Sequence, residues 1–270
     1  MGMTSNTTSH YVWVEHPEGR LFARHWTPID ESAVPRTRAP LLLFHDSLGS
    51  VGLWRNFPEA LCEATGRQVI AYDRLGFGRS SARTDRLNLD FIADEAASVL
   101  PVLRAQLGLE TFIAFGHSVG GAMAVECAAQ WSDACVGLIT EAAQVFPEDR
   151  TLDGIRVAQQ QFAQPGQVER LAKYHGDKTQ WVLNAWIGTW LDPAFAGWSL
   201  VPNLPQVVCP ALIMHGAHDE YGSLRHPELI RSLAGGPTRI EIFENGHHVP
   251  HREDSERIIF LVTEFVMSLP

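Results

Sequence analysis

One serine stands in a pattern that could make it a nucleophile. Ser118 is the centre of the run Gly-His-Ser-Val-Gly, which follows an apolar run, Phe112–Phe115, and precedes a helical pattern, Gly120–Gln130. A serine on a sharp turn from strand to helix exposes its hydroxyl, and small residues two positions either side let the strand and helix approach. We therefore predict nucleophilic catalysis by Ser118, with the N–H of Val119 donating to a developing oxyanion.

The partners of such a serine are expected at the ends of later strands. Asp219 lies in the loop after the apolar run Ala211–Met214, and His247 lies in the loop after Arg239–Phe243. Because the carboxyl ends of parallel strands lie at one edge of a sheet, both side chains should meet the serine there. We predict that His247 takes the serine proton and that Asp219 orients the imidazole.

Other residues compete for these roles. Glu141, just after the strand-like run Val136–Ile139, is a second candidate for the acid. His248, adjacent to His247, is expected to face the substrate pocket or solvent. The spacing of His247 and His251 would suit a metal, but Pro250 breaks a helix between them and no third ligand is evident, so no metal site is predicted.

The elements that must position these residues alternate between strands and helices. An N-terminal hairpin is expected first, and continuous apolar runs typical of strands buried on both faces follow it. Helical patterns between these runs predict an α/β fold with a mostly parallel, doubly wound sheet. The expected strands are Tyr11–Glu15, Leu21–Trp26, Leu41–Phe44, Val69–Ala71, Phe112–Phe115, Val136–Ile139, Leu212–Met214 and Ile240–Phe243.

One stretch interrupts the alternation. Residues 145–205 contain helical patterns and no strand, so we predict a helical lid inserted into a core domain of residues 1–144 and 206–270. Trp186 and Trp190 recur at helical spacing within the stretch. Most such aromatic residues pack a lid onto its core, but these two are candidates to line a substrate pocket.

Several motifs together resemble the α/β-hydrolases that carry a lid. They are Phe-His-Asp-Ser-Leu-Gly at 44–49, Tyr-Asp-Arg-Leu-Gly-Phe-Gly-Arg-Ser at 72–80, the run around Ser118, His-Gly-Ala-His-Asp at 215–219, and Gly-His at 246–247. The resemblance covers nearly the whole chain. It implies a second oxyanion donor in the loop after the first core strand, where we expect the backbone N–H of Ser47. Asp46 replaces the glycine usual there and is a candidate to touch substrate, as is His248.

The resemblance implies a serine hydrolase that cleaves a carboxylic ester or lactone of a small, largely apolar substrate through an acyl-enzyme. The group also includes carbon–carbon bond hydrolases of aromatic ring-fission products, and non-hydrolytic members such as cofactor-free oxygenases, perhydrolases and ligand receptors. These stay open as alternatives. The glycines at 76–78 lack the spacing of a dinucleotide fingerprint, so no nicotinamide or flavin cofactor is expected.

Composition and net charge limit the classes of partner that the chain is expected to bind. The chain has 270 residues and a formal net charge of −10, with no basic stripe, which argues against nucleic acid and anionic membranes and leaves a small-molecule substrate. The four cysteines form no redox or zinc motif, and the first ten residues hold no apolar stretch. We therefore expect a cytoplasmic protein without a signal peptide.

Overall fold

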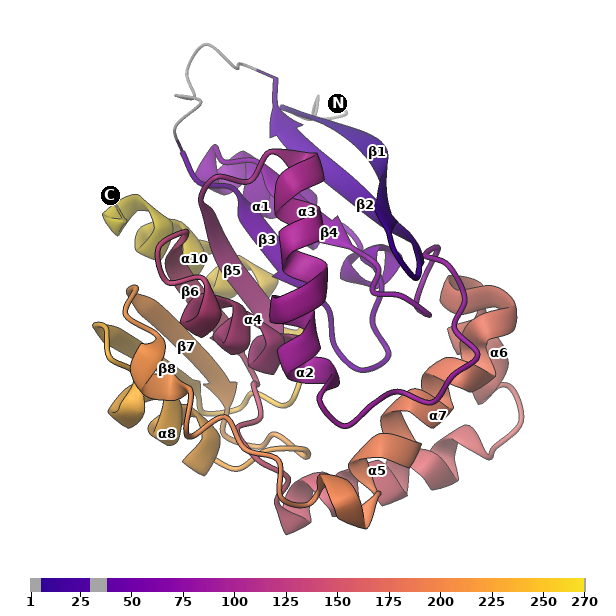
Figure 1. Cartoon of the computed structure of the whole chain (residues 1–270). Helices are drawn as coiled ribbons and strands as arrows, with labels where there is room; N and C mark the ends of the chain where they lie inside the picture. Colours follow the sequence, from indigo (N-terminus) through magenta and orange to yellow (C-terminus); the bar gives the residue numbers. More distant parts are fainter. Residues whose placement is uncertain (1–5, 30–37, 270) are drawn as a thin grey trace.

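A single sheet organises the chain. The computed structural model describes residues 6–29 and 38–269, so residues 1–5, the start of the stretch considered for a signal peptide, lie outside it. The order of the eight strands is β1-β2-β4-β3-β5-β6-β7-β8; β2 pairs antiparallel with β1 and β4, and the other pairs are parallel (Figure 1). The strands are β1 (Thr7–His16), β2 (Gly19–Pro28), β3 (Leu41–Phe44), β4 (Val69–Tyr72), β5 (Phe112–His117), β6 (Cys135–Glu141), β7 (Ala211–Gly216) and β8 (Thr238–Phe243).

Helices cover both faces of this sheet, because successive strand residues point to opposite sides. Leu41 and Leu43 pack into the core beneath α1 and α10, whereas Leu42 and Phe44 pack into the core beneath α2, α3 and α4. The covering helices are α1 (Phe57–Thr65), α2 (Phe91–Asp94), the π-helical turn η3 (Glu95–Val99), α3 (Leu100–Leu107), α4 (Val119–Gln130), α8 (Arg225–Leu233), α9 (Pro250–Glu253) and α10 (Ser255–Ser268), with the 3₁₀ turn η2 (Val51–Trp54) before α1. The predicted α/β class with a mostly parallel sheet is confirmed.

The segment between β6 and β7 is helical, as the sequence predicts. It contains α5 (Asp149–Phe162), α6 (Gln167–His175), η4 (Gly176–Lys178), α7 (Thr179–Trp190), η5 (Pro193–Phe195) and η6 (Leu204–Gln206). Figure 1 shows α5, α6 and α7 grouped at one side of the molecule, apart from the helices that cover the sheet. Among the described residues between β6 and β7 none belongs to a strand. We call residues 145–205 the helical insertion.

Hydrogen bonds of Glu148 and His175 are among those that tie the helical insertion to the rest of the chain. The carboxylate of Glu148, before α5, accepts hydrogen bonds from the backbone N–H of Ser223 at 2.5 Å and from its hydroxyl at 2.9 Å. His175, at the end of α6, accepts from the N–H of Gly78 at 2.9 Å, and its other ring nitrogen donates to the carbonyl of Leu48 at 2.9 Å. The insertion is therefore held at both its start and its middle.

Candidate active site

Ser118 occupies a strained turn between β5 and α4. Its backbone has φ 57° and ψ −125°, a left-handed conformation that costs a non-glycine residue about 1–3 kcal/mol. The turn is tight because both flanking glycines touch backbone: a Cβ on Gly116 would lie 2.0 Å from the carbonyl oxygen of Gly120, and one on Gly120 would lie 2.1 Å from that of Phe44. The small residues that the sequence analysis singled out are thus required by close approach of strand and helix.

His248, and not His247, is the histidine beside this serine. The Nε2 atom of His248 lies 3.0 Å from the Oγ of Ser118, and its Nδ1 lies 2.8 Å and 2.9 Å from the two carboxylate oxygens of Asp219. Because a carboxylate only accepts hydrogen bonds, Nδ1 is the protonated nitrogen and Nε2 is free to accept the serine proton. Serine, imidazole and carboxylate therefore form one continuous chain of hydrogen bonds.

The prediction that His247 meets Ser118 is wrong in this structure. The side chain of His247 is 58% exposed, and its Nδ1 lies 3.8 Å from a carboxylate oxygen of Glu220. The backbone N–H groups of His247 and Val249 both donate to the carboxylate of Glu253 on α9, at 2.7 Å and 3.0 Å. These two bonds fix the loop so that the side chain between them, His248, faces inward.

Asp219 is held as a charged acceptor. The residue is fully buried in the loop after β7, as predicted, and it also accepts from the backbone N–H of Tyr221 at 2.7 Å and of Gly222 at 3.2 Å. Burial raises the pKa of its carboxyl, but the nearby His248, followed by His215 and the backbone donors, outweighs burial, so the pKa lies below its usual value. Asp219 is therefore ionised at neutral pH and fixes the orientation of His248.

Glu141, the alternative acid, pairs with a different histidine. Its two carboxylate oxygens accept from the backbone N–H of His251 at 2.5 Å and from the Nδ1 of His251 at 2.6 Å. Both residues are buried, and the ring of His251 packs against Trp54 and Phe57 with centroids 4.9 Å and 5.1 Å away. Of the two candidate acids, Asp219 is therefore the one that contacts the histidine beside Ser118.

Two backbone N–H groups lie near the serine without a partner of their own. Val119 is the first residue of α4, where an N–H has no acceptor within the helix. Ser47 lines the cavity in front of Ser118, in the loop after β3. Across residues 6–29 and 38–269, no acceptor bonds either N–H. Both positions fit the predicted oxyanion donors.

A cavity of about 180 Å³ opens in front of Ser118. Its walls come from the loop after β3, the turn that carries Ser118, the segment after β6, α5, α7 and the loops after β7 and β8. It is lined by Asp46, Ser47, Leu48, Ser118, Gln144, Thr151, Ile155, Trp186, Trp190, Tyr221, His248 and Val249. The four residues predicted to touch substrate, Asp46, Trp186, Trp190 and His248, are all among them. A cavity of this size holds a group about as large as a benzene ring.

Two lining residues that were not predicted from the sequence lie beside Ser118 and His248. The Oε1 of Gln144 lies 3.4 Å from the Oγ of Ser118, and the ring of Tyr221 lies 4.7 Å from that of His248. Burial, together with Glu220 and Asp219, raises the pKa of Tyr221 to about 12, so its phenol stays protonated. Tyr221 stands two residues after Asp219, and Gln144 three after Glu141, so both follow strand ends where site residues gather.

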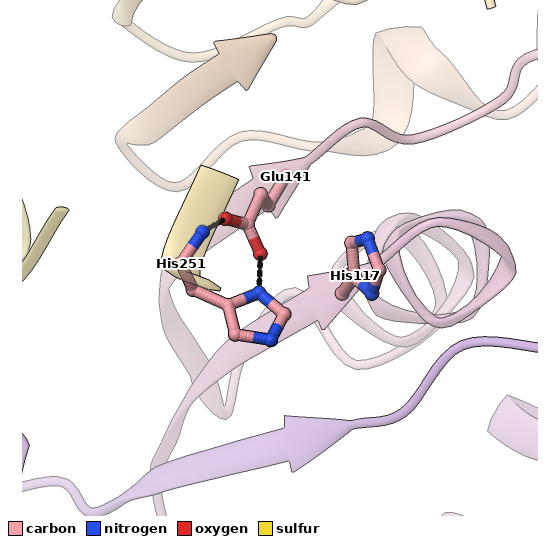
Figure 2. Close-up of side chains that lie close together, drawn as sticks. All are labelled: His117, Glu141 and His251. Carbon is pink, nitrogen blue, oxygen red and sulfur yellow. Dashed lines mark hydrogen bonds and ion pairs between the residues drawn. The ribbon is translucent and has the colours of Figure 1, made fainter. Parts of the chain in front are cut away.

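A second cluster of polar side chains lies close to the site. One potential ligand atom from each of His117, Glu141 and His251 lies within 4.8 Å of the other two, and Figure 2 shows Glu141 bonded to His251 with His117 beside them. These residue types can bind a metal. However, Glu141 is engaged by His251, and the two ring nitrogens of His117 face the carbonyl of His248 and the carboxylate of Asp46. Glu141 and His117 thus already have polar partners.

Residues 39–176, just over half of the chain, match the family model described as the alpha/beta hydrolase fold. The chain belongs to the alpha/beta hydrolase family. Its strained Ser118, with the histidine and aspartate after later strands, follows the order Ser, acid, His of that fold. The predicted family resemblance is confirmed.

Among its curated relatives is a (lyso)-N-acylphosphatidylethanolamine lipase from Bos taurus. The two sequences are 34% identical over a stretch that covers 45% of this chain and 35% of the relative. A proline iminopeptidase from Lactobacillus delbrueckii subsp. lactis is 40% identical over 33% of this chain and 30% of the relative. The matched stretches thus span about a third of the relatives' own length. The solved enol-lactonase from Burkholderia xenovorans LB400 has the same fold, with a TM-score of 0.70, 17% identity, and coverage of 95% of this chain and 100% of that chain.

In the part of the chain that the structure describes, no helix combines the length and apolar character needed to cross a bilayer.

Proposed function

We propose that this protein is a serine hydrolase that cleaves a carboxylic ester or lactone with a small, largely apolar acyl group. The observation that carries the proposal is the hydrogen-bonded chain from Ser118 through His248 to Asp219, ending at the cavity. The strained backbone of Ser118 aims its hydroxyl away from β5 and α4. This arrangement supports nucleophilic attack on a carbonyl carbon in the cavity.

The proposed reaction has two halves. The Oγ of Ser118 attacks the carbonyl carbon while Nε2 of His248 accepts the serine proton, and the N–H groups of Val119 and Ser47 hold the resulting oxyanion. The C–O bond to the alkoxy group then breaks, and His248 protonates the leaving oxygen. In the second half a water molecule, deprotonated by His248, attacks the acyl-enzyme and releases the acid with Ser118 restored.

The lining of the cavity supports a neutral acyl group. Ile155, Trp186 and Trp190 supply apolar walls, and none of the lining residues is lysine or arginine. Burial raises the pKa of Asp46, but His117 outweighs burial, so the pKa lies far below its usual value and Asp46 is a carboxylate in the cavity wall. A carboxylate on the substrate would meet this like charge in a desolvated site, which disfavours anionic acyl groups.

We further propose that the helical insertion, residues 145–205, acts as a lid over the substrate. Four of its residues, Thr151, Ile155, Trp186 and Trp190, line the cavity opposite Ser118. Enclosure by such helices excludes water and strengthens the electrostatic interactions at the reacting carbonyl. In this proposal the core, residues 1–144 and 206–270, supplies the chemistry, and the insertion selects the acyl group.

A substrate panel tests the proposed function. The panel contains 4-nitrophenyl acetate, butyrate and benzoate, γ- and δ-lactones, an acyl thioester, a ring-fission diketone and proline 4-nitroanilide. We expect the highest kcat/KM on an uncharged ester or lactone, with turnover of about 1–1,000 per second on the best substrate. Ser118→Ala should reduce this hydrolysis by at least about 10³-fold. Preference for the diketone or the prolyl amide, or equal rates in Ser118→Ala, would reject the proposal.

A further inference from the structure

Two links join the serine turn to the loop that carries His248. The first runs through Glu141, whose backbone carbonyl accepts the N–H of Ser118 at 2.8 Å and whose carboxylate holds the N–H and Nδ1 of His251. The second runs through His117, the residue before Ser118, whose Nε2 lies 2.7 Å from the backbone carbonyl oxygen of His248. The nucleophile and the base are thus connected behind the cavity as well as inside it.

His117 has an acceptor on each side of its ring. Its Nε2 faces the carbonyl of His248 at 2.7 Å, and its Nδ1 lies 3.4 Å from the Oδ2 of Asp46. A carbonyl oxygen and an ionised carboxylate can only accept, so both ring nitrogens must carry hydrogens if both contacts are to be favourable. The two acceptors therefore favour His117 as an imidazolium, with Nε2–H donating to the His248 carbonyl and Nδ1–H forming an ion pair with Asp46 at 3.4 Å.

The surroundings of His117 can hold this charge. The ring is buried, and groups from five segments face it: Asp46 after β3, the Trp54 ring of η2, Glu141 at the end of β6, the carbonyl and the ring of His248 after β8, and His251 of α9. Burial lowers the pKa of His117, but the hydrogen bond to Asp46 and the charges of Glu141 and Asp46 outweigh burial and raise the pKa above its usual value. Two carboxylates thus compensate one cation.

His117 lies between two loops that line the cavity. Asp46 lines the cavity beside Ser47, the proposed oxyanion donor, and His248 lines it as the proposed base. The imidazolium therefore joins the loop that offers an oxyanion donor to the loop that offers the base. A neutral imidazole carries a single N–H and could keep only one of these two contacts.

We propose that His117 is a positioning residue that, as an imidazolium, holds the His248 loop and the Asp46–Ser47 loop in register with Ser118. This inference rests on the proposed function, because the His248 loop matters for catalysis only if His248 is the base. His117 does not line the cavity and transfers no proton to substrate. Its loss should lower kcat and leave KM nearly unchanged.

A matched pair of substitutions separates the two contacts. In His117→Gln the side-chain amide nitrogen lies near the place of Nε2 and can donate to the His248 carbonyl. In His117→Asn the shorter amide lies near the place of Nδ1 and can reach only Asp46. We expect His117→Gln to keep kcat within about 5-fold of wild type. His117→Asn should lower kcat about 10- to 100-fold, as expected for an orphaned buried carbonyl, with KM within about 2-fold.

The pH profile gives a readout that a merely structural role would not move. In the wild type kcat should fall at alkaline pH as His117 loses its second proton, by no more than the roughly 5-fold expected for His117→Gln, because both then keep only the contact to the His248 carbonyl. His117→Gln should lack this alkaline loss because an amide does not titrate. The exposed His218 provides the control: His218→Gln should keep the wild-type profile. Circular dichroism and thermal unfolding establish that each variant is folded.

Equal kcat in His117→Asn and His117→Gln, or an alkaline loss that persists in His117→Gln, would overturn the inference. If His117→Asn does not fold, the pH profile of His117→Gln alone decides. Covalent labelling of Ser118 in the wild type by a fluorophosphonate distinguishes the two proposals. Absence of labelling rejects the proposed function, whereas labelling with an unaltered profile in His117→Gln rejects only the role of His117.

Discussion

The histidines of two histidine–carboxylate pairs are three residues apart in the chain, His248 in the loop after β8 and His251 in α9, and their environments differ. His248 bonds Asp219 through Nδ1 at 2.8 Å, and His251 bonds Glu141 through Nδ1 at 2.6 Å. The side chain of His248 is 12% exposed and presents Nε2 to Ser118 and the cavity, whereas that of His251 is 3% exposed and packs against Trp54 and Phe57. In the proposed mechanism, access to a nucleophile and to substrate distinguishes the His248–Asp219 pair from the enclosed His251–Glu141 pair, which joins α9 to β6.

The largest difference between neighbouring residues is expected at His248, the proposed base. His248→Ala should reduce kcat by about 10⁴- to 10⁶-fold, because Ser118 would lose the group that takes its proton. His247→Ala, which removes an exposed ring from the neighbouring position, should stay within about 2-fold of wild type. Steady-state hydrolysis of the best ester or lactone measures both. A large loss in His247→Ala with little loss in His248→Ala would restore the assignment made from sequence.

The two acids should separate activity from stability. Asp219→Asn should reduce kcat about 10⁴-fold with little change in the free energy of unfolding, because the amide no longer selects the correct tautomer of His248. Glu141→Gln should cost about 1–3 kcal/mol of unfolding free energy, because one buried contact to His251 loses its acceptor, and should lower kcat less than about 10-fold. Urea titrations and kinetics on the same preparations test this; the reverse pattern would contradict the division of roles.

The smallest expected effect concerns the pH dependence of stability. Burial lowers the pKa of His251, although Glu141 opposes the shift, so the folded pKa lies below the unfolded value of about 6.5. The unfolded chain then binds a proton that the fold does not, and stability falls as pH decreases below about 6.5. The wild type should lose up to about 1.4 kcal/mol per pH unit more than His251→Asn between pH 6 and 5. Parallel slopes in urea titrations at several pH values would argue that His251 stays free to protonate in the fold.

Much of the scaffold could be predicted from the sequence. Continuous apolar runs locate each of the parallel strands, and β3 spans Leu41–Phe44 as expected. Ser118 and Asp219 follow from the same reasoning, because Ser118 comes directly after β5 and Asp219 lies in the loop after β7, both strands that a run of apolar residues defines. The apolar runs are sufficient to locate these strands because a strand buried on both faces of a sheet must be apolar at successive positions.

The remaining parts of the site depend on long-range contacts. His247 and His248 are adjacent in a loop with no periodicity, and the bonds from that loop to Glu253 decide which one faces inward. Gln144 and Tyr221 come close to Ser118 and His248 only when β6 and β7 lie side by side. The two carboxylates could be ranked from sequence, but their histidine partners could not, because Glu141 and His251 are far apart in the chain.

The most direct test of the central claim is to identify the residue that an active-site-directed fluorophosphonate labels. Folded wild-type protein should react at Ser118, seen by mass spectrometry of the labelled peptide. Ser118→Ala should not react, and His248→Ala should react at least about 10³-fold more slowly while His247→Ala reacts at the wild-type rate. No labelling of the wild type, or labelling that survives in Ser118→Ala, would contradict the assignment of Ser118 as a nucleophile activated by His248.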